Sequence, residues 1–310
     1  MGDQQVTDVT DGRPEATASG RRKATGPGRR RPRPDFWTLA GLPGLLFVLL
    51  AFGVPMVTIV IRSLTDPSPA NFEFIFTDEL FRRSLLRTVY VALLVTGLSV
   101  LLGYPYAYAM ARSGPVLRTW LMGALLLSFW TSLLVRTFAW GVLLSNTGVV
   151  NSLLLDLGLI DEPLPLIRNL FAVLVGMVHV LVPFATLAIY ASLRGIDAEL
   201  EQAARVMGAR PSRAFWHVTL PLSLPGVAAG GVLVFVLSLG FYLTPALLGG
   251  PADILVSQSI VLQVQQYLDP GVGSAMAVVL LALVLAFLAV VSRVVGLGRV
   301  LGVAGQGEGR

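Results

Sequence analysis

The chain contains no cysteine and only two histidines, and 13% of its 310 residues are charged. The lack of cysteine excludes disulfides, zinc–thiolate sites and thiol catalysis. The histidines, His179 and His217, lie far apart, and there is no His-Glu-x-x-His run or comparable constellation of the kind that a membrane-embedded enzyme would need. We therefore predict that the chain is not an enzyme and that it binds no metal or other cofactor itself.

Hydrophobic residues are abundant instead, at 55% of the chain, and the mean hydropathy is +0.74. A soluble domain cannot hide so much apolar surface, whereas an integral membrane protein can leave it in contact with lipid. The formal net charge of +5 would suit a nucleic-acid partner, but the charged residues fall at the edges of apolar segments. The composition therefore predicts a membrane protein that binds no nucleic acid.

Six apolar segments are long enough to cross the roughly 30 Å hydrocarbon core of a bilayer as helices of about 20 residues. They are residues 39–61, 86–111, 119–144, 170–193, 224–249 and 272–295. The predicted fold is all-α, a polytopic membrane protein with six transmembrane helices. Its parts are a disordered basic tail (1–35), the first transmembrane helix (36–64), an outer loop (65–85), a core with five further transmembrane helices (86–296) and a second tail (297–310).

The distribution of arginine and lysine predicts the orientation in the membrane. Far more of them fall in the tails and in the loops on the same side as the tails than in the loops on the other side. The positive-inside rule then places both termini and the 194–223 loop in the cytoplasm. The arginine-rich stretch 29–33 is either an anchor that sets this topology or a contact for the anionic headgroups of membrane lipids.

The predicted membrane segments contain no Asp or Glu, and their clearest charge is Arg136. An arginine at that depth faces the protein interior or water. Two roles stay open for it: bonding backbone carbonyls near a helix break, or lining a translocation path. We interpret His179 as a packed, hydrogen-bonded residue. Further candidates for lining a path are Pro183, Tyr242, Thr244 and Pro245, since proline in a membrane helix frees backbone groups that can face a water-filled cavity.

The 194–223 loop has helix signals of its own. Asp197 stands at an N-cap position, and Leu200, Ala203, Ala204 and Met207 have the spacing of one apolar helix face. Gly208 is placed to end this helix in a left-handed conformation. Pro211 then starts a second short helix, which we expect Pro221 to stop. On pattern alone, this two-helix element could also be an amphipathic hairpin that lies on the lipid headgroups.

The order of residues in this loop resembles the coupling loop of ABC importer permeases. The matching residues are Gln202-Ala203-Ala204, then Gly208 after three further residues, and then Leu220-Pro221. Other motifs between about 40 and 296 resemble the spermidine/putrescine-type permeases. These are Leu102-Gly103-Tyr104-Pro105, Phe129 to Ser132, Val135-Arg136-Thr137, Tyr190 to Leu193, Phe215-Trp216 and Phe241 to Gly250.

This resemblance implies a type I importer permease in a bacterial inner membrane that carries a small solute, polyamine-like, by alternating access. Its partners would be two cytoplasmic ATPase subunits, which bind ATP and Mg, a second permease that forms a heterodimer with it, and a periplasmic or lipid-anchored substrate-binding protein. The residues that it implies for ATPase coupling are Glu201, Gln202, Ala203, Ala204, Met207, Gly208, Leu220 and Pro221. The chain has no phosphate-binding Gly-Lys-Ser/Thr loop, so its ATP chemistry must come from a partner.

The chain departs from the family at Gln202, where the family carries an acidic residue. Glu201 stands one position earlier, but one residue turns a side chain by about 100° around an α-helix. We therefore expect docking to depend on the alanine face and Gly208 more than on charge. The alternative function is a secondary transporter driven by an ion gradient. That class usually buries a relay of ionisable groups, for which these segments supply only Arg136 and His179.

Overall fold

The computed structural model describes residues 36–66 and 68–295. Within these ranges all regular elements are helical, as predicted. The predicted tails 1–35 and 297–310 lie outside the described residues. The described chain divides into two units, with the boundary between residues 52 and 53.

The helices have the following bounds: α1 (Phe36–Thr65), α2 (Ala70–Thr77), α3 (Glu79–Arg112), α4 (Pro115–Trp130), α5 (Leu133–Leu143), α6 (Val149–Asp156), α7 (Leu170–Arg194), α8 (Ala198–Val206), α9 (Pro211–Ala214), the π turn η1 (Phe215–Thr219), α10 (Leu220–Leu239), α11 (Leu243–Leu248), the 3-10 turn η2 (Pro251–Asp253), α12 (Val256–Gln265) and α13 (Pro270–Val295).

Helix α1 begins in the first unit and ends in the second. The apolar side chains between Leu42 and Phe52 are exposed in the chain alone. For a membrane helix this is the expected state, because lipid tails solvate apolar side chains as well as a protein core does.

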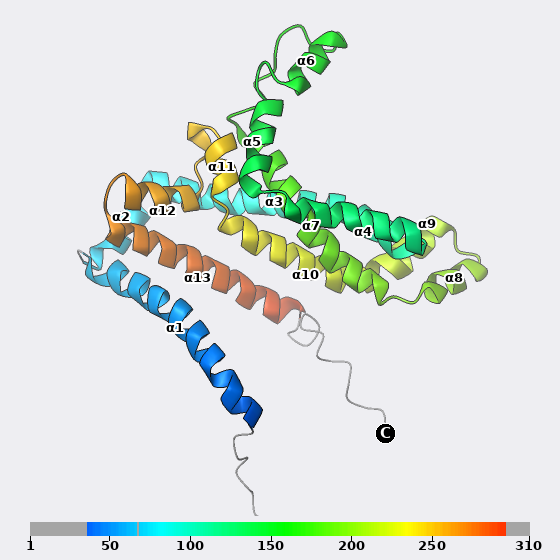
Figure 1. Ribbon diagram of the computed structural model, residues 1–310, viewed down its shortest axis with the longest axis horizontal. Coiled ribbons are helices and arrows are strands. Elements are labelled where there is room, and N and C mark those ends of the chain that lie inside the picture. Colours follow the sequence, from blue (N-terminus) through cyan, green and yellow to red (C-terminus); the bar gives the residue numbers. More distant parts are fainter. Residues whose placement is uncertain (1–35, 67, 296–310) are drawn as a thin grey trace, which may run out of the picture. The chain divides into compact units, whose positions relative to one another are not determined.

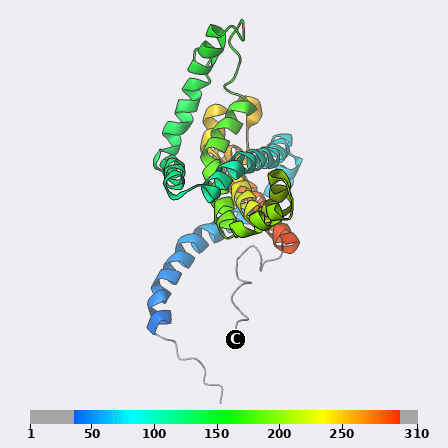
Figure 2. The same cartoon turned by 90° about the vertical axis from the view of Figure 1, so that its right-hand side faces the viewer.

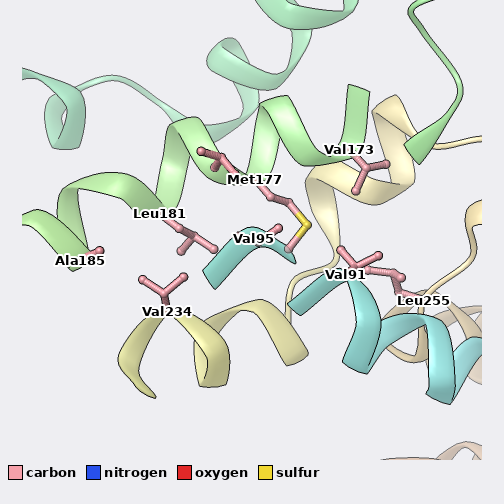
Figure 3. Packing of buried hydrophobic residues seen from close by; sticks show 9 residues of the cluster. Val91, Val95, Val173, Met177, Leu181, Ala185, Val234 and Leu255 are labelled. Atoms are coloured by element: carbon pink, nitrogen blue, oxygen red, sulfur yellow. The ribbon is translucent and has the colours of Figure 1, made fainter. Parts of the chain in front are cut away.

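In the second unit, the centre is made of α3, α7 and α10, each of which packs against the other two (Figure 1). Their shared core contains Val91 and Val95 from α3, Met177 and Leu181 from α7, and Val234 from α10, all nearly inaccessible to solvent (Figure 3). These apolar side chains form one buried cluster. Van der Waals contact of this kind drives helix association in lipid, where burial itself gives little.

Two small residues, Gly226 and Gly230, let α10 approach α7 closely. A Cβ atom on Gly226 would lie 2.2 Å from the Cβ of Ser192, and one on Gly230 would lie 3.1 Å from the carbonyl oxygen of Ala185. Both glycines are buried. The contact between these two helices therefore depends on the absence of side chains at these positions.

Four of the six predicted membrane segments each fall within one helix. Residues 39–61 lie in α1, 86–111 in α3, 170–193 in α7 and 272–295 in α13. In the described part of the chain, five helices are long and apolar enough to cross a membrane, and α4 with α5 makes a sixth if the bent pair counts as one span.

The prediction of one helix over 119–144 is wrong. Helix α4 ends at Trp130, and α5 begins at Leu133 after a bend of 95°, which is visible in Figures 1 and 2. Thr131 and Ser132 between them have extended backbones. Hydropathy alone cannot detect this break, because the segment is apolar on both sides of it.

The prediction of one span over 224–249 is also wrong at its C-terminal end. Helix α10 ends at Leu239, and a separate short helix, α11, follows from Leu243. The hydroxyl of Ser257 donates a hydrogen bond of 2.6 Å to the carbonyl oxygen of Phe241 in the connection. A side chain from another segment thus satisfies a backbone group that a continuous helix would have satisfied itself.

We predict that Gly226→Ala destabilises the protein, whereas Gly97→Ala in α3 does not. The added methyl group at 226 meets Ser192, and such overpacking costs about 1–3 kcal/mol. Gly97 is exposed, and a methyl group there would meet no neighbouring atom within 4 Å, so alanine should gain about 0.5–1 kcal/mol of helix stability. Thermal unfolding of the purified variants in detergent measures both changes. Equal melting temperatures would contradict the close packing of α7 and α10.

Candidate functional site

The first helix of the 194–223 loop forms as predicted. Helix α8 follows Asp197, which occupies the N-cap position, although its side chain makes no capping hydrogen bond. At the other end Gly208 has a φ of +91°. Its N–H donates to the carbonyl of Arg205, and the N–H of Ala209 donates to that of Ala204. These two bonds make the Schellman motif, in which glycine is preferred because its φ is positive.

The second helix also begins as predicted, at Pro211, but Pro221 does not stop it. The helical run continues through the π turn η1 into α10 and ends at Leu239. Within the turn, the N–H of Leu220 donates to the carbonyl of Phe215, five residues back. A π turn widens the helix just before the proline and so relieves the clash between its ring and the preceding turn. The loop is therefore continuous with a membrane helix.

One side of α8 and its C-terminal end carries large apolar side chains with no cover in the described chain. Met207 is 83% exposed, Val206 88% and Leu200 49%. Gln202 and Ala203 are exposed as well. Exposed apolar groups gathered on one short helix mark a contact surface. We call this surface the docking face.

Glu201 points the other way, into the protein. Its side chain is only 14% exposed, and Nη2 of Arg112 donates to its Oε2 over 3.0 Å. The hydroxyl of Thr219 donates to the same oxygen over 3.1 Å, and the hydroxyl of Tyr108 donates to Oε1 over 3.5 Å. We call these four residues the carboxylate cluster. It joins α8 to the last two turns of α3 and to η1.

A group of aromatic rings lies next to the carboxylate cluster. The ring of Phe215 meets the rings of Tyr104 and Tyr108 edge-on, at centroid distances of 5.8 Å and 5.4 Å. The hydroxyl of Tyr104 lies 2.9 Å from Oγ of Ser223 in α10. These contacts hold η1 against α3.

The structure thus brings most of the predicted coupling residues together on α8 and its C-terminal end. Leu220 and Pro221 lie elsewhere, at the start of α10. Sequence reasoning missed Tyr108, Arg112 and Thr219, because they are up to 93 residues from Glu201 along the chain. The only signal was that Arg112 directly follows the predicted segment 86–111, and basic residues are common at the C-terminal end of a helix because of the helix dipole.

Arg136 lies at the break between α4 and α5. It is 8% exposed, and its Nη2 donates to the carbonyl oxygens of Ser128 and, over 3.0 Å, Thr131. Helix α4 ends at this point, where its last carbonyls have no intrahelical donor. Of the two roles left open for Arg136, bonding to backbone carbonyls beside a helix break is confirmed. The arginine also lines a hollow of about 310 Å³.

His179 and Pro183 line a larger and mostly apolar hollow of about 740 Å³ between α3, α4, α5 and α7. Nε1 of Trp140 donates a 2.8 Å hydrogen bond to Nδ1 of His179. The predicted hydrogen bonding of His179 is confirmed, but its side chain is exposed in the chain alone and so is not packed in a core. No group of His, Asp and Glu that could hold a metal ion occurs among the residues that the structure describes.

The other candidates for a path lie elsewhere. Tyr242 lines a third hollow, of about 490 Å³, together with Arg168 and several glutamines. Thr244 and Pro245 are buried in α11, where the hydroxyl of Thr244 lies 3.3 Å from that of Thr137. In the three hollows described above, the five path candidates therefore do not come together.

Comparison with known proteins gives matches over most of the chain. The family described as "Binding-protein-dependent transport system inner membrane component" matches residues 99–297. The spermidine/putrescine transport system permease protein PotB of Salmonella typhimurium (strain SL1344) is 32% identical over 242 residues, which are 75% of this chain and 84% of the relative. The molybdenum transport system permease protein ModB of Mycobacterium bovis is 30% identical over 248 residues, 80% of this chain and 89% of the relative.

A solved structure shares the fold. A chain of the bacterial alginate ABC transporter, in complex with an alginate pentasaccharide-bound periplasmic protein, superposes with a TM-score of 0.65 at 20% sequence identity. The match covers 83% of this chain and 93% of that one. At this identity the likeness concerns the fold alone.

We predict that Arg136→Met lowers stability by about 1–3 kcal/mol for each carbonyl that it leaves without a donor. Arg83→Met is the control, because Arg83 is an exposed arginine whose pair with Glu79 lies at the surface and such pairs contribute about 1 kcal/mol or less. Thermal unfolding in detergent measures the difference. If Arg136→Met were as stable as the control variant while transport fell, the arginine would act in the path and not at the helix break.

Proposed function

The chain belongs to the binding-protein-dependent transport system inner membrane component family and is a permease subunit of an ABC importer; from this premise we propose how it couples to ATP hydrolysis and what it carries. The 194–223 loop is the coupling element, and a cytoplasmic ATPase subunit binds its docking face. The observation that carries this proposal is the exposure of Met207, Val206 and Leu200 on one short helix, on a chain whose sequence has no ATP-binding loop of its own.

The docking face is suited to a partner that binds it through shape complementarity more than through charge. The predicted coupling residues Gln202 and Ala203 are uncharged and exposed, and Ala204 beside them is half-buried. Alanine side chains let another surface come close to the helix, and Gly208 turns the chain sharply without a side chain in the way. Gln202 offers a neutral hydrogen bond to the ATPase. ATP and Mg bind to that partner, and this chain supplies no ligand to them.

The remaining partners follow from the family. A second permease pairs with this chain as a heterodimer around a translocation path, and a periplasmic or lipid-anchored binding protein delivers the solute. Both termini and the coupling element face the cytoplasm, which the distribution of arginine supports. Among the described residues Arg136 is the only charged side chain that is buried. A transporter driven by an ion gradient usually buries a relay of such groups, so this observation favours the ATP-driven class.

The proposed cargo is a polyamine, as in the PotB relative. Polyamines are multivalent cations, which aromatic faces and uncharged oxygens can bind. Tyr242 is 41% exposed in the hollow of about 490 Å³, and the glutamines at 258, 265 and 266 line the same hollow. Carboxylates that select for cations would then come from the binding protein and the second permease.

A second candidate cargo is an oxyanion, as the name of the ModB relative suggests. The observation that favours it is the charge around the same hollow. Arg168 lines it, and no Asp or Glu does. A guanidinium group is suited to bind an oxyanion through paired hydrogen bonds. The two candidates differ in the sign of their charge, so one assay separates them.

We predict that spermidine uptake requires ATP in proteoliposomes that contain this chain with its partner permease, ATPase and binding protein. The measurement is uptake of labelled spermidine with and without ATP inside the vesicles, with labelled molybdate in a parallel sample. Spermidine uptake with ATP supports the proposed cargo, and molybdate uptake alone supports the second candidate. Uptake of either solute on an ion gradient without ATP would overturn the importer mechanism.

We predict that Gly208→Asp reduces ATP-driven uptake about tenfold, because a side chain at positive φ costs about 1–2 kcal/mol and distorts the end of α8. Gly208→Asn should retain most of the uptake, since asparagine tolerates this conformation best among the other residues. Gly195→Asp controls for the added charge, because Gly195 lies in the same loop with an ordinary φ of −80°. Full uptake with Gly208→Asp would contradict the role of this turn.

A further inference from the structure

We propose that Glu201 is a positioning residue that transmits movement of the docking face to the membrane helices, and that it does not contact the ATPase. This inference rests on the proposed function of the 194–223 loop. The acidic residue that directly precedes the coupling motif then belongs to the inside of the subunit. The resemblance to the family places an acidic residue next to it, at Gln202, on the exposed side.

The burial and bonding of Glu201 support this assignment. With 14% of the side chain exposed, little of the carboxylate is accessible to a partner. Three donors from two other elements already occupy its oxygens: Arg112, Thr219 and Tyr108. A carboxylate in this state has little capacity left for a further strong hydrogen bond from another subunit.

Glu201 is also the point where α8 is bonded to the rest of the subunit. Among the described residues, every side-chain hydrogen bond that joins α8 to α3 or to η1 ends on Glu201. The most extensive contacts of α8 are with η1 and α9, its neighbours in the loop. A force on the docking face therefore reaches α3 mainly through this one carboxylate.

The partners of Glu201 lie at the ends of long helices. Arg112 is the last residue of α3, and Thr219 lies in the helical run that continues to Leu239. Both runs belong to the group of α3, α7 and α10 at the centre of the second unit. A displacement of one carboxylate thus acts on two membrane helices together, and rigid helices carry it across the bilayer.

In this proposal, the π turn η1 is the element that changes conformation when the docking face moves. Its residues, Phe215–Thr219, lie between the loop and the membrane part of the same helical run. π turns are local irregularities that occur often at functional sites. The Phe215 ring holds this turn against Tyr104 and Tyr108, while Thr219 connects it to Glu201. The aromatic rings therefore fix the first residue of η1, and the carboxylate cluster fixes its last residue.

The test is the number of solute molecules taken up per ATP hydrolysed by the reconstituted transporter. We expect Glu201→Gln and Arg112→Gln each to lower this ratio about tenfold, the value of a hydrogen bond between charged groups. The double variant should be no worse than either single one, because both changes break the same pair. Glu199→Gln is the matched control, since Glu199 is an exposed acidic residue in the same helical turn.

A milder variant keeps the test valid if Glu201→Gln prevents assembly. Thr219→Val removes one donor without a change of shape, and it should lower the ratio by less, in the same direction. A merely structural role would reduce uptake and ATP hydrolysis in proportion and leave the ratio unchanged, and that result would overturn the proposal. So would additive losses in the double variant.

Hydrogen exchange gives an independent measurement on the assembled complex. Glu201→Gln should speed exchange of the amides in α8, whereas Glu199→Gln should not. If the wild-type complex shows no ATP-driven uptake, the proposed function fails. If it transports and Glu201→Gln couples like the wild type, only the assignment of Glu201 fails.

Discussion

A membrane segment must satisfy its own backbone hydrogen bonds, and the rest of this structure depends on that constraint. Continuous helices do so by themselves, and at three interruptions in this chain a side chain bonds a backbone group that the helix leaves free. Arg136 donates to the carbonyls at the end of α4. Ser257 donates to the carbonyl of Phe241 after α10, and Thr88 accepts from the N–H of Val256 at the start of α12. The bent and short helices are therefore built features of the fold.

The same constraint explains why the central helices can act as a unit. Because lipid gives no hydrophobic force between helices, α3, α7 and α10 associate through close contact. Gly226 and Gly230 bring α10 against α7, and Gly103 brings α3 against Thr186 of α7. Packed surfaces of this kind resist small continuous deformation. A displacement at one end of α3 or α10 is then felt by the whole group.

How well the sequence predicts each feature depends on how far apart along the chain the interacting residues lie. Helices such as α7 and α13, and the glycine turn at Gly208, depend on neighbours within a few residues, and their prediction was correct. The 95° bend after Trp130 depends on Arg136, whose bonding was one of two open interpretations. The passage of the helix through Pro221 depends on a π turn, for which the sequence carries no recognised signal. The carboxylate cluster joins residues up to 93 positions apart, so no local pattern could reveal it.

The carboxylate of Glu201 connects the docking face to α3 and η1. In an α-helix, the side chains of neighbouring residues point about 100° apart. In α8, a side chain at position 202 is therefore exposed, whereas one at position 201 faces α3 and η1. This chain carries Gln202 on the exposed side and Glu201 on the buried side. A mostly covered carboxylate without donors would be destabilising, and Arg112, Thr219 and Tyr108 supply those donors. The rotation of α8 about its axis thus explains both features: Gln202 is neutral and exposed, and Glu201 is charged and hydrogen-bonded within the subunit.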